Sequence, residues 1–444
     1  MKIKYYNNSS ILIEYKNTKI LFDPWLVGQS NYGSWGIFPE LKINWDDFKD
    51  LDYIHISHIH TDHLHEETLK KLPNHIPILI HNWDDKFVKR ILESWGKKVI
   101  EIEHGEKFNL GDDLDFHLYA ADGCDPEACF KFFGCGKMSN PSKSVGIDTF
   151  SLLKSDKKTF VQINDCPYPL MKNTLNKLKD KFKTIDLLFV SYTGAGSYPQ
   201  CWSHYTDDEK LNKYGLVKKQ KFLDWGMGIL DILKPKHYMP YAGQYFLSGF
   251  LSKLDKFKVT PTIPEALKFY KENYKEGISF CLNQNEYFDL ETEKSSSPYI
   301  HPNEDEKEKY IDNVLSQIKF PYEYDDEVNL EQLLELIPNA FKRYSNKRKE
   351  LNFSTNTNIY LHLMDGKMIK IPCNGDNFTV INKDEFNDTR YVTYKIHPKL
   401  LLRILKGPRY AHMNNAEGGS HIEFTRKPEI YERKLYYSMN FFHS

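Results

Sequence analysis

The segment from His58 to His63 holds four side chains of the kinds that bind transition metals within six residues: His58, His60, Asp62 and His63. His58 and His60 are two residues apart at the end of an apolar run, and side chains two apart on a strand point to the same side. Asp62 and His63 then fall in the following turn, within reach of a second cation. Imidazole and carboxylate together bind zinc, iron or manganese. This spacing predicts a dinuclear metal centre rather than a histidine-rich surface turn.

A second segment offers a carboxylate that would join two cations. Asp165 follows the apolar segment 160–164 and precedes Cys166-Pro167, so it stands where a strand gives way to a loop. Two cations a few ångströms apart usually share a bridging ligand. We therefore expect Asp165 to bridge, rather than to be an ordinary strand-end aspartate, and we predict that Asp62 and Asp165 take part in catalysis.

Short β-rich segments and helical segments alternate up to about Phe280, which predicts an α/β domain. The expected strands are 2–6, 11–15, 19–22, 77–81, 98–102, 114–120, 149–154, 159–164 and 185–191. The expected helices are 66–72, 84–94 and 175–182. The metal-binding residues would lie in loops at one edge of these strands.

The second part of the chain has a different pattern. A serine-rich stretch at 295–298 and a charged run at 303–309 indicate a boundary, with domains at 1–295 and 300–444. Helical spacing follows at 310–318 and 330–344, and Asp365-Gly366 between two apolar segments predicts a hairpin. We expect a smaller α+β domain that caps a substrate or forms a homodimer.

Composition narrows the class of protein. At 444 residues the chain exceeds the size of one compact core. Sixty Lys and Arg residues balance 61 Asp and Glu residues, which argues against an obligate nucleic-acid partner. Seven cysteines, the lack of a signal peptide and the lack of a long apolar run predict a reduced, cytoplasmic protein with no membrane span. Cys124, Cys129 and Cys135 lack paired C-x-x-C spacing, so we expect buried or loop thiols rather than a metal cluster.

Aromatic residues near the expected metal-edge loops suggest a pocket for a medium-sized polar organic molecule. The residues chosen are Trp25, Tyr192, Tyr198 and Tyr241, with packing of the loops as the alternative. The basic run 218–221 could meet an anionic group of the substrate, but a solvated helix face is the preferred interpretation.

Several segments together resemble a known family. They are FDPWLVG at 22–28, HISHIHTDHL at 55–64, ADGCDPE at 121–127, INDCPYP at 163–169, YTGAGSYP at 192–199, MPYAGQYF at 239–246 and the tail at 424–442. The first two and the later strand-end aspartate are similar to the metallo-β-lactamase superfamily. The whole set resembles the C-terminal catalytic portion of the CMP-N-acetylneuraminate hydroxylase family. The resemblance implies a four-layer αββα sandwich with metals at one edge.

Two departures from the family pattern matter. The hydroxylase family carries an N-terminal Rieske domain, and no C-x-H…C-x-x-H pair occurs here, so electrons would come from a separate donor protein. Hydrolases of the fold supply a third histidine just before the bridging aspartate. At that place this chain has a carboxylate, for which Asp122 is the first choice and Asp125 the second. His104 and His117 are rival ligands, whereas His237 is expected to be structural.

An acidic ligand makes the site harder, which favours iron or manganese over zinc. A similar acidic exchange is known in the di-iron β-hydroxylase branch of the fold, which the motif also resembles. The resemblance therefore implies two iron ions, with zinc or manganese as alternatives, and O2 as co-substrate for hydroxylation of a small metabolite. The alternative function is a hydrolase of an ester, lactone or phosphoester.

Overall fold

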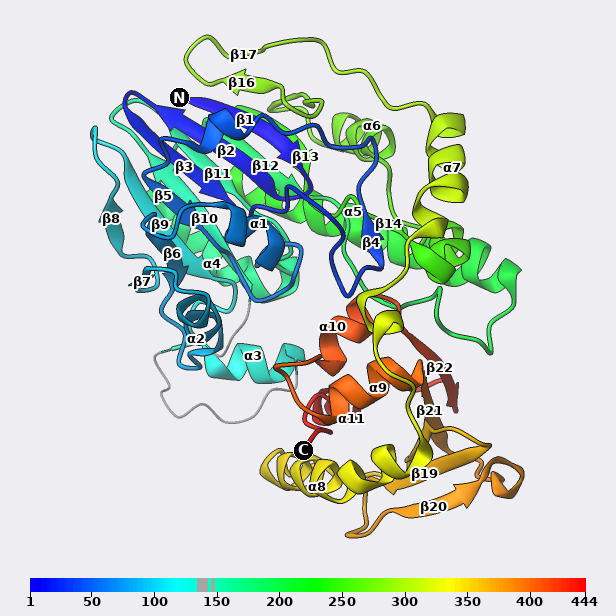
Figure 1. Cartoon of the computed structure of the whole chain (residues 1–444). Coiled ribbons are helices and arrows are strands. Elements are labelled where there is room, and N and C mark those ends of the chain that lie inside the picture. Colours follow the sequence, from blue (N-terminus) through cyan, green and yellow to red (C-terminus); the bar gives the residue numbers. More distant parts are fainter. Residues whose placement is uncertain (134–142, 145–147) are drawn as a thin grey trace.

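The computed structural model describes residues 1–133, 143–144 and 148–444 of the chain. Its N-terminal domain consists of two large sheets packed face to face, with helices on both outer faces (Figure 1). This arrangement confirms the expected four-layer αββα sandwich. A smaller domain, formed by the C-terminal part of the chain, lies beneath one end of the sandwich (Figure 1).

The first sheet has eight strands and mixes antiparallel and parallel pairs. In spatial order they are β17 (Lys294–Ser295), β16 (Tyr287–Asp289), β1 (Lys2–Asn7), β2 (Ser10–Tyr15), β3 (Thr18–Phe22), β5 (Tyr53–His55), β6 (Ile78–His81) and β7 (Val99–Ile102). From β3 to β7 the pairs are parallel, so the loops after these strands leave at the same edge.

The second sheet has seven strands. In order they are β15 (Ile278–Ser279), β13 (His237–Tyr241), β12 (Leu187–Ser191), β11 (Thr159–Gln162), β10 (Thr149–Lys154), β9 (Asp115–Ala120) and β8 (Lys107–Asn109). β11, β12 and β13 are parallel, whereas β10 runs antiparallel to β11. The end of β11 and the start of β10 therefore meet at one edge. A short pair, β4 (Trp35–Gly36) and β14 (Phe246–Leu247), lies apart from both sheets.

The helices cover the outer faces of the sandwich and bury apolar side chains against the sheets. α1 (Glu66–Lys71) and α2 (Phe87–Ser94) flank the first sheet, and α4 (Tyr168–Lys181), α5 (Gly215–Leu233) and α6 (Ile263–Asn273) pack along the second (Figure 1). The largest cluster of buried apolar side chains fills the space between the sheets and continues under α4 to α6.

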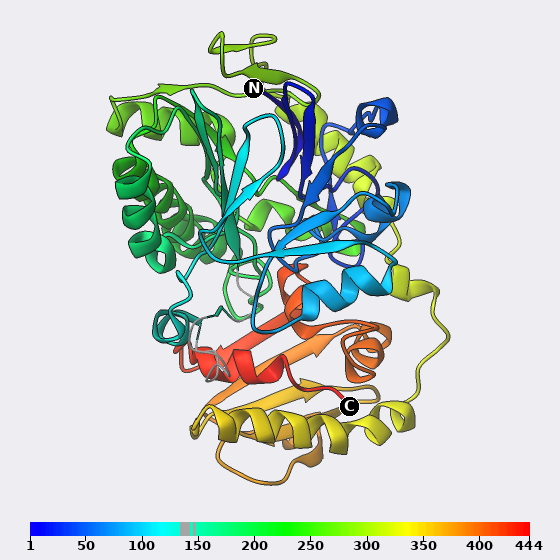
Figure 2. The ribbon, with the colours of Figure 1, turned by 90° about the vertical axis from the view of Figure 1, so that its left-hand side faces the viewer.

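The C-terminal domain is built on a five-stranded sheet. Its strands, in order, are β20 (Thr379–Asn382), β19 (Lys367–Pro372), β18 (Asn358–His362), β21 (Tyr391–Ile396) and β22 (Ile422–Lys427). The helices of this domain are α8 (Leu330–Glu350), α9 (Pro398–Leu405), α10 (Met413–Gly418) and α11 (Arg433–Met439), whereas α7 (Glu304–Asn313) lies beside the sandwich (Figure 1). α8 contacts both α9 and α11, so these three helices lie together on one face of the sheet; in Figure 2, α8 lies at the end of the domain remote from the sandwich. α3 (Pro126–Phe133) of the N-terminal domain contacts α11.

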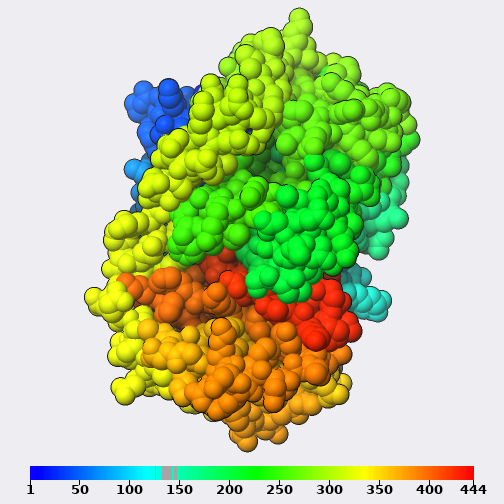
Figure 3. All heavy atoms as spheres, turned by 90° about the vertical axis from the view of Figure 1, so that its right-hand side faces the viewer, coloured from blue at the N-terminus to red at the C-terminus, as the bar shows by residue number. Residues whose placement is uncertain are grey.

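The two domains share a hydrophobic core. Trp25, Trp35 and Tyr245 belong to the same buried cluster as Ile359 and Phe424 of the C-terminal sheet. The backbone also crosses between the domains: Phe424 donates its N–H to the carbonyl of Cys201 at 2.8 Å, and Ser203 donates to Phe424 at 2.9 Å. The spheres of the C-terminal part accordingly abut those of the sandwich in Figure 3.

Most of the sequence-based element predictions are confirmed, with two corrections. The expected hairpin is present, with Asp365 and Gly366 at φ values of 53° and 68°, as its tight turn requires. The helix expected at 310–318 begins earlier, inside the charged run, as α7, and ends in a separate 3-10 turn (Leu315–Gln317). The helix expected at 175–182 begins at Tyr168, because Pro167 and Pro169 are acceptable in a first turn. In the part of the chain that the structure describes, no helix is both long and apolar enough to cross a bilayer.

Candidate metal centre

Two groups of ligand-type side chains meet at one edge of the sandwich. His58, His60 and Asp165 form one group, and Asp62, His63 and Asp165 form the other. Within each group the donor atoms lie within 4.8 Å of one another. Asp165 belongs to both groups, which is the arrangement that a bridging carboxylate between two cations needs.

The parallel register of the first sheet brings the metal-binding turn to this edge. Phe22 of β3 is paired with His55 of β5, so Asp23 and Ser57 emerge side by side. Ser57 donates its N–H to Asp23 Oδ1 at 2.7 Å and its hydroxyl to Asp23 Oδ2 at 2.8 Å. From the other sheet, Thr149 donates its hydroxyl to the carbonyl of Ser57 at 2.6 Å. The turn is thus fixed from both sheets.

The surroundings of His63 show that this edge suits a cation. Its Nδ1 lies 3.1 Å from Asp23 Oδ2, which places the ring proton on that side. Its Nε2 is buried without a hydrogen-bond partner and faces Asp62 and Asp165 oxygens at 3.2 and 3.3 Å. Two carboxylates around this nitrogen need positive charge between them, which a second ring proton or a bound metal ion supplies. The donor set therefore fits a bound metal ion.

The two imidazoles of the other group are oriented in the same way. His58 Nδ1 lies 3.0 Å from Ser57 Oγ, and its Nε2 lies 2.8 Å from His60 Nδ1. The same His58 nitrogen is 3.7 Å from Asp165 and 3.7 Å from Asp148. The nitrogens and carboxylates of this group therefore converge on one small volume.

Asp148 is a residue that the sequence analysis missed. Ser151 of β10 is paired with Gln162 of β11 in antiparallel register, so Asp148, three residues before Ser151, lies level with Asp165, three residues after Gln162. Burial and the nearby Asp165 charge raise the pKa of Asp148 to about 6, although His60 lowers it. Its side chain is 15% exposed and thus open to the site.

The structure does not bring Asp122 or Asp125 into either group found among the described residues. The carbonyl of Asp148 accepts the N–H of Ala121 at 3.0 Å, and Asp122 follows in the turn after β9. Asp122 accepts hydrogen bonds from Cys124 N at 2.9 Å and from Ser144 Oγ. Asp125 caps α3 by accepting the Glu127 N–H at 2.9 Å. Asp148 also lies outside the two groups, but it is the further carboxylate that approaches His58, at 3.7 Å.

Asn8 holds Asp62 from the turn between β1 and β2. Its Nδ2 donates to Asp62 Oδ2 at 2.8 Å, while its Oδ1 accepts the N–H of Gly243 at 2.5 Å. Asn8 is 1% exposed and has a φ of 46°, which asparagine tolerates better than most residues. The carboxylate of Asp62 is therefore oriented by a residue 54 positions away in the sequence.

The electrostatics of the site reflect its crowded charges. Burial lowers the pKa of His58 well below its ordinary value, and the neighbouring His63 adds to this effect. Burial alone would also lower the pKa of His63, but the carboxylates of Asp62, Asp23 and Asp165 outweigh it and raise that pKa well above its ordinary value. Buried carboxylates in such number need positive charge nearby, which two divalent cations would supply.

Three of the four aromatic residues chosen as substrate contacts are packed inside the protein. Trp25, Tyr192 and Tyr241 expose 0, 2 and 1% of their surface. The hydroxyl of Tyr241 forms two hydrogen bonds inside the protein: it accepts from Gln162 Nε2 at 3.0 Å and donates to the carbonyl of Ser9. These residues support the loops instead of lining a pocket. Tyr198 is partly exposed and packs against the core shared by the two domains.

Other chosen side chains also have structural surroundings. Lys218 does not lie on a solvated face: burial lowers its pKa to about 7, and it donates to the carbonyls of Tyr198 at 2.7 Å and Lys258 at 3.0 Å. His237 lies at the start of β13, at the opposite edge from the metal groups, as expected for a structural histidine.

The rival ligands and the cysteines also stay outside the two groups. His104 Nδ1 accepts the N–H of Ala120 at 3.1 Å, and His117 Nδ1 lies 3.3 Å from the carbonyl of Gly105. Cys124 is partly exposed and Cys129 is buried, as expected for loop and buried thiols, and Cys135 lies outside the described residues.

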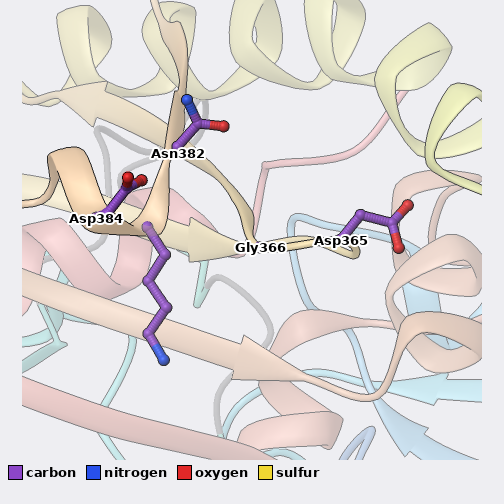
Figure 4. A pocket seen from close by; sticks show the side chains of 5 residues that line it. Asp365, Gly366, Asn382 and Asp384 are labelled. Carbon is purple, nitrogen blue, oxygen red and sulfur yellow. The ribbon is translucent and has the colours of Figure 1, made fainter.

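A surface hollow lies on the C-terminal sheet rather than at the metal groups. Asp365 and Gly366 of the β18–β19 turn line it together with Asn382, Lys383 and Asp384. The carboxylate of Asp365 points away from Asn382 and Asp384 (Figure 4), so their donor groups do not converge. Among the described residues, none of those that line this hollow belongs to the two metal groups.

Comparison with known proteins agrees with the fold. Residues 2–117 match the family model described as the Beta-lactamase superfamily domain. Together with the four layers, this match shows that the N-terminal part is a metallo-β-lactamase-fold domain, to which a C-terminal domain is added.

The cytidine monophosphate-N-acetylneuraminic acid hydroxylase of Pan troglodytes is 24% identical over 276 residues, which cover 60% of this chain and 42% of that protein. The first curated relatives are matched over half of their own length or less.

Two solved structures are also similar. CmlA, a diiron beta-hydroxylase from Streptomyces venezuelae, has a TM-score of 0.40 and 15% identity, with 64% of this chain and 53% of that chain covered. An isothiocyanate hydrolase from Delia radicum gut bacteria has a TM-score of 0.44 and 16% identity, with 65% of this chain and 98% of that chain covered. These two likenesses concern the fold alone.

Proposed function

We propose that the chain is a dinuclear, iron-dependent oxygenase that hydroxylates or oxidises a small polar metabolite. His58, His60, Asp148 and Asp165 would hold one cation, and Asp62, His63 and Asp165 would hold the other. The observation that carries the proposal is the large share of carboxylate around this centre: three carboxylates accompany three imidazoles. Oxygen-rich, hard donor sets favour iron or manganese over zinc. The hydroxylase name of the distant relatives supports the same direction.

Some residues at this centre would orient the ligands, and others would face the substrate. Asp23 and Ser57 orient the imidazoles of His63 and His58, and Asn8 orients the carboxylate of Asp62. Asp165 is 22% exposed on its side chain and Asp148 is 15% exposed, whereas His63 is fully buried. A substrate would therefore approach from the side of Asp148 and Asp165.

Two bound iron ions would supply the redox chemistry by which O2 is activated. In a hydroxylation, a C–H bond becomes C–OH with one atom of O2, and the second atom leaves as water with two protons and two electrons. The electrons would come from a separate donor protein, which makes such a donor a proposed partner. The alternative is a hydrolase, in which the centre lowers the pKa of a bound water.

One experiment separates the oxygenase from the hydrolase. The metal-free protein is loaded with Fe²⁺, Mn²⁺ or Zn²⁺, and the cations per chain are counted. O2 uptake is then followed with a chemical reductant and candidate substrates, which include CMP-N-acetylneuraminate and simple esters and lactones. We expect two cations per chain, uptake in the iron form, and product oxygen that carries ¹⁸O from labelled O2. Full activity of the zinc form, with product oxygen from labelled water, would contradict the oxygenase and support the hydrolase.

The proposed ligand set makes a separate prediction, because Asp148 and Asp122 are close in space but differ in role. Asp148→Ala should weaken the cation held with His58 and His60 by about 10-fold or more, since it removes a charged ligand. Asp122→Ala should keep both affinities and lose only stability. Competition with a chelating dye measures these affinities with Zn²⁺. Equal affinities in wild type and Asp148→Ala, with a loss in Asp122→Ala, would return the ligand role to Asp122.

A further inference from the structure

A residue of the C-terminal domain reaches the metal-binding turn. Asn414 lies on α10, and its Oδ1 is 3.0 Å from Nε2 of His60. The two residues are 354 positions apart in the sequence. The sandwich by itself leaves this nitrogen of His60 without that contact, so the environment of a proposed ligand depends on the second domain.

The contact selects one form of the His60 ring. A neutral imidazole carries one N–H, and the amide oxygen of asparagine only accepts hydrogen bonds. The proton of His60 therefore lies on Nε2, and Nδ1 keeps a free lone pair. That Nδ1 is the nitrogen that faces His58 Nε2 at 2.8 Å. In the other form, His60 Nδ1 would carry the proton and donate it to His58 Nε2. Neither of these two facing nitrogens would then be available to a cation.

His58 is prepared in a complementary way. The hydroxyl of Ser57 donates to Asp23 Oδ2 at 2.8 Å, so its oxygen only accepts: from Asn164 Nδ2 at 2.8 Å and from the Nδ1 proton of His58 at 3.0 Å. The Nε2 of His58 is consequently bare as well. His58 Nε2 and His60 Nδ1 thus both carry a lone pair and repel each other at 2.8 Å. A cation bound by both nitrogens would remove this repulsion. Asn414 is the group that completes this arrangement.

The position of Asn414 is fixed by the way the domains dock. His412 is the N-cap of α10, and its Nδ1 accepts the N–H of Asn414 at 3.2 Å. The N–H of His412 donates to the hydroxyl of Tyr32, in the N-terminal domain, at 2.7 Å. The start of α10 is therefore attached to the loop that follows β3, close to the metal-binding turn.

We propose that Asn414 is a positioning residue that holds His60 in the form presenting Nδ1, so that docking of the C-terminal domain controls cation binding at the His58–His60 group. The proposal rests on the proposed metal-binding function of this group. It does not depend on whether the centre performs oxygenation or hydrolysis.

The test uses the full chain, freed of metal and titrated with Zn²⁺ against a chelating dye, and with Co²⁺ followed by its visible absorption. Asn414→Leu removes the acceptor at similar size, whereas Asn414→Asp keeps an oxygen that accepts. Asn415→Leu is the matched control, because the side chain of Asn415 bonds to Tyr32 on the same helix. We expect Asn414→Leu to weaken one of the two cations about 10- to 100-fold and to leave the other unchanged. Asn414→Asp and Asn415→Leu should bind as wild type.

Wild-type affinity in Asn414→Leu, or an equal loss in Asn415→Leu, would overturn the proposal. If Asn414→Leu does not fold, as judged by circular dichroism, Asn414→Ala takes its place with the same expected result. His58→Ala separates this inference from the proposed function. If His58→Ala still binds two cations normally, the ligand set itself is wrong. If it loses one cation and Asn414→Leu loses none, only the role of Asn414 is wrong.

Discussion

Asp165 is the residue on which both metal groups depend. It lies beyond the end of β11, and its oxygen is 3.3 Å from His63 and 3.7 Å from His58. Burial by itself raises the pKa of Asp165, but the charge of the nearby His63 lowers that pKa below its ordinary value. A carboxylate that stays ionised at neutral pH is well suited to neutralise two cations.

We predict that Asp165→Ala loses both cations, whereas His58→Ala or His60→Ala loses one. The fold should persist, because the core between the sheets is apolar and does not include these residues. Metal analysis after dialysis against excess Zn²⁺ measures the stoichiometry, with Asp180→Ala as a surface control. Two cations retained by Asp165→Ala would show that the bridge lies elsewhere.

Asp122 makes stability depend on pH because its carboxyl is buried. Burial raises the pKa of its carboxyl to about 6, although bonds from Ser144 and Cys124 oppose the shift. The folded protein therefore holds a proton that the unfolded chain releases above about pH 4. The stabilisation is present below that pH and is lost as the pH rises through about 6.

Asp122→Asn removes the titration while keeping the oxygen that accepts both bonds. We expect the free energy of unfolding of the wild type to fall by about 1 kcal/mol more than that of the variant between pH 5 and pH 7. Urea unfolding of both proteins at the two pH values, with a chelator present to exclude metal effects, gives the difference. Parallel pH dependences in the two proteins would contradict the assignment.

At the level of elements, the loop after β13 supports the metal edge through its backbone. Gly243 has a φ of 79°, and its N–H donates to Asn8, which in turn holds Asp62. A Cβ at this position would lie 2.2 Å from Cγ2 of Thr193. The glycine therefore serves both a left-handed backbone conformation and a close approach of two loops.

Gly243→Ala should destabilise the protein by roughly 2 kcal/mol or more and weaken the cation held with Asp62, because the loop must move away from Asn8. Gly366→Ala is the matched control: its φ is 68°, but no heavy atom lies within 4 Å of its added Cβ. That variant should lose only about 1 kcal/mol and keep both cations. Thermal unfolding and Zn²⁺ titration compare the two. Equal metal affinity in wild type and Gly243→Ala would show that the loop does not act on Asp62.

At the level of the whole molecule, the shared core joins the domains into one folding unit. Trp25, Trp35 and Trp202 are buried in the same cluster as the C-terminal sheet, and the backbone of Cys201 and Ser203 bonds to Phe424. Separation of the domains would expose these side chains to water at a cost of about 25 cal/mol per Å² of apolar surface.

We predict that the two domains unfold together in a single transition. Tryptophan fluorescence and far-ultraviolet circular dichroism should give the same midpoint in guanidinium chloride. Phe424→Ala should shift that one midpoint by the equivalent of about 3–5 kcal/mol, whereas Val380→Ala, at a side chain 45% exposed, should barely change it. Two separate transitions in the wild type would mean that the domains are independent.

The sequence by itself was enough to predict the site residues that lie close together in the chain. His58, His60, Asp62 and His63 lie within one turn, so their spacing and the strand before them were enough to predict convergence on cations. The alternating apolar segments predicted an α/β domain, and the resemblance of the family motifs implied the αββα sandwich. The helix α5 received no such prediction, since its apolar and charged residues show no clear single face.

Tertiary structure alone decided which distant residues complete the site. Asp148 rather than Asp122 meets His58 because the antiparallel register of β10 and β11 sets which residues lie level, and one residue of offset reverses the side-chain direction. Asn414 reaches His60 only because a second domain docks on the edge of the sandwich. Neither register nor docking leaves a signal in local spacing, since both arise from contacts between segments that are far apart in the chain.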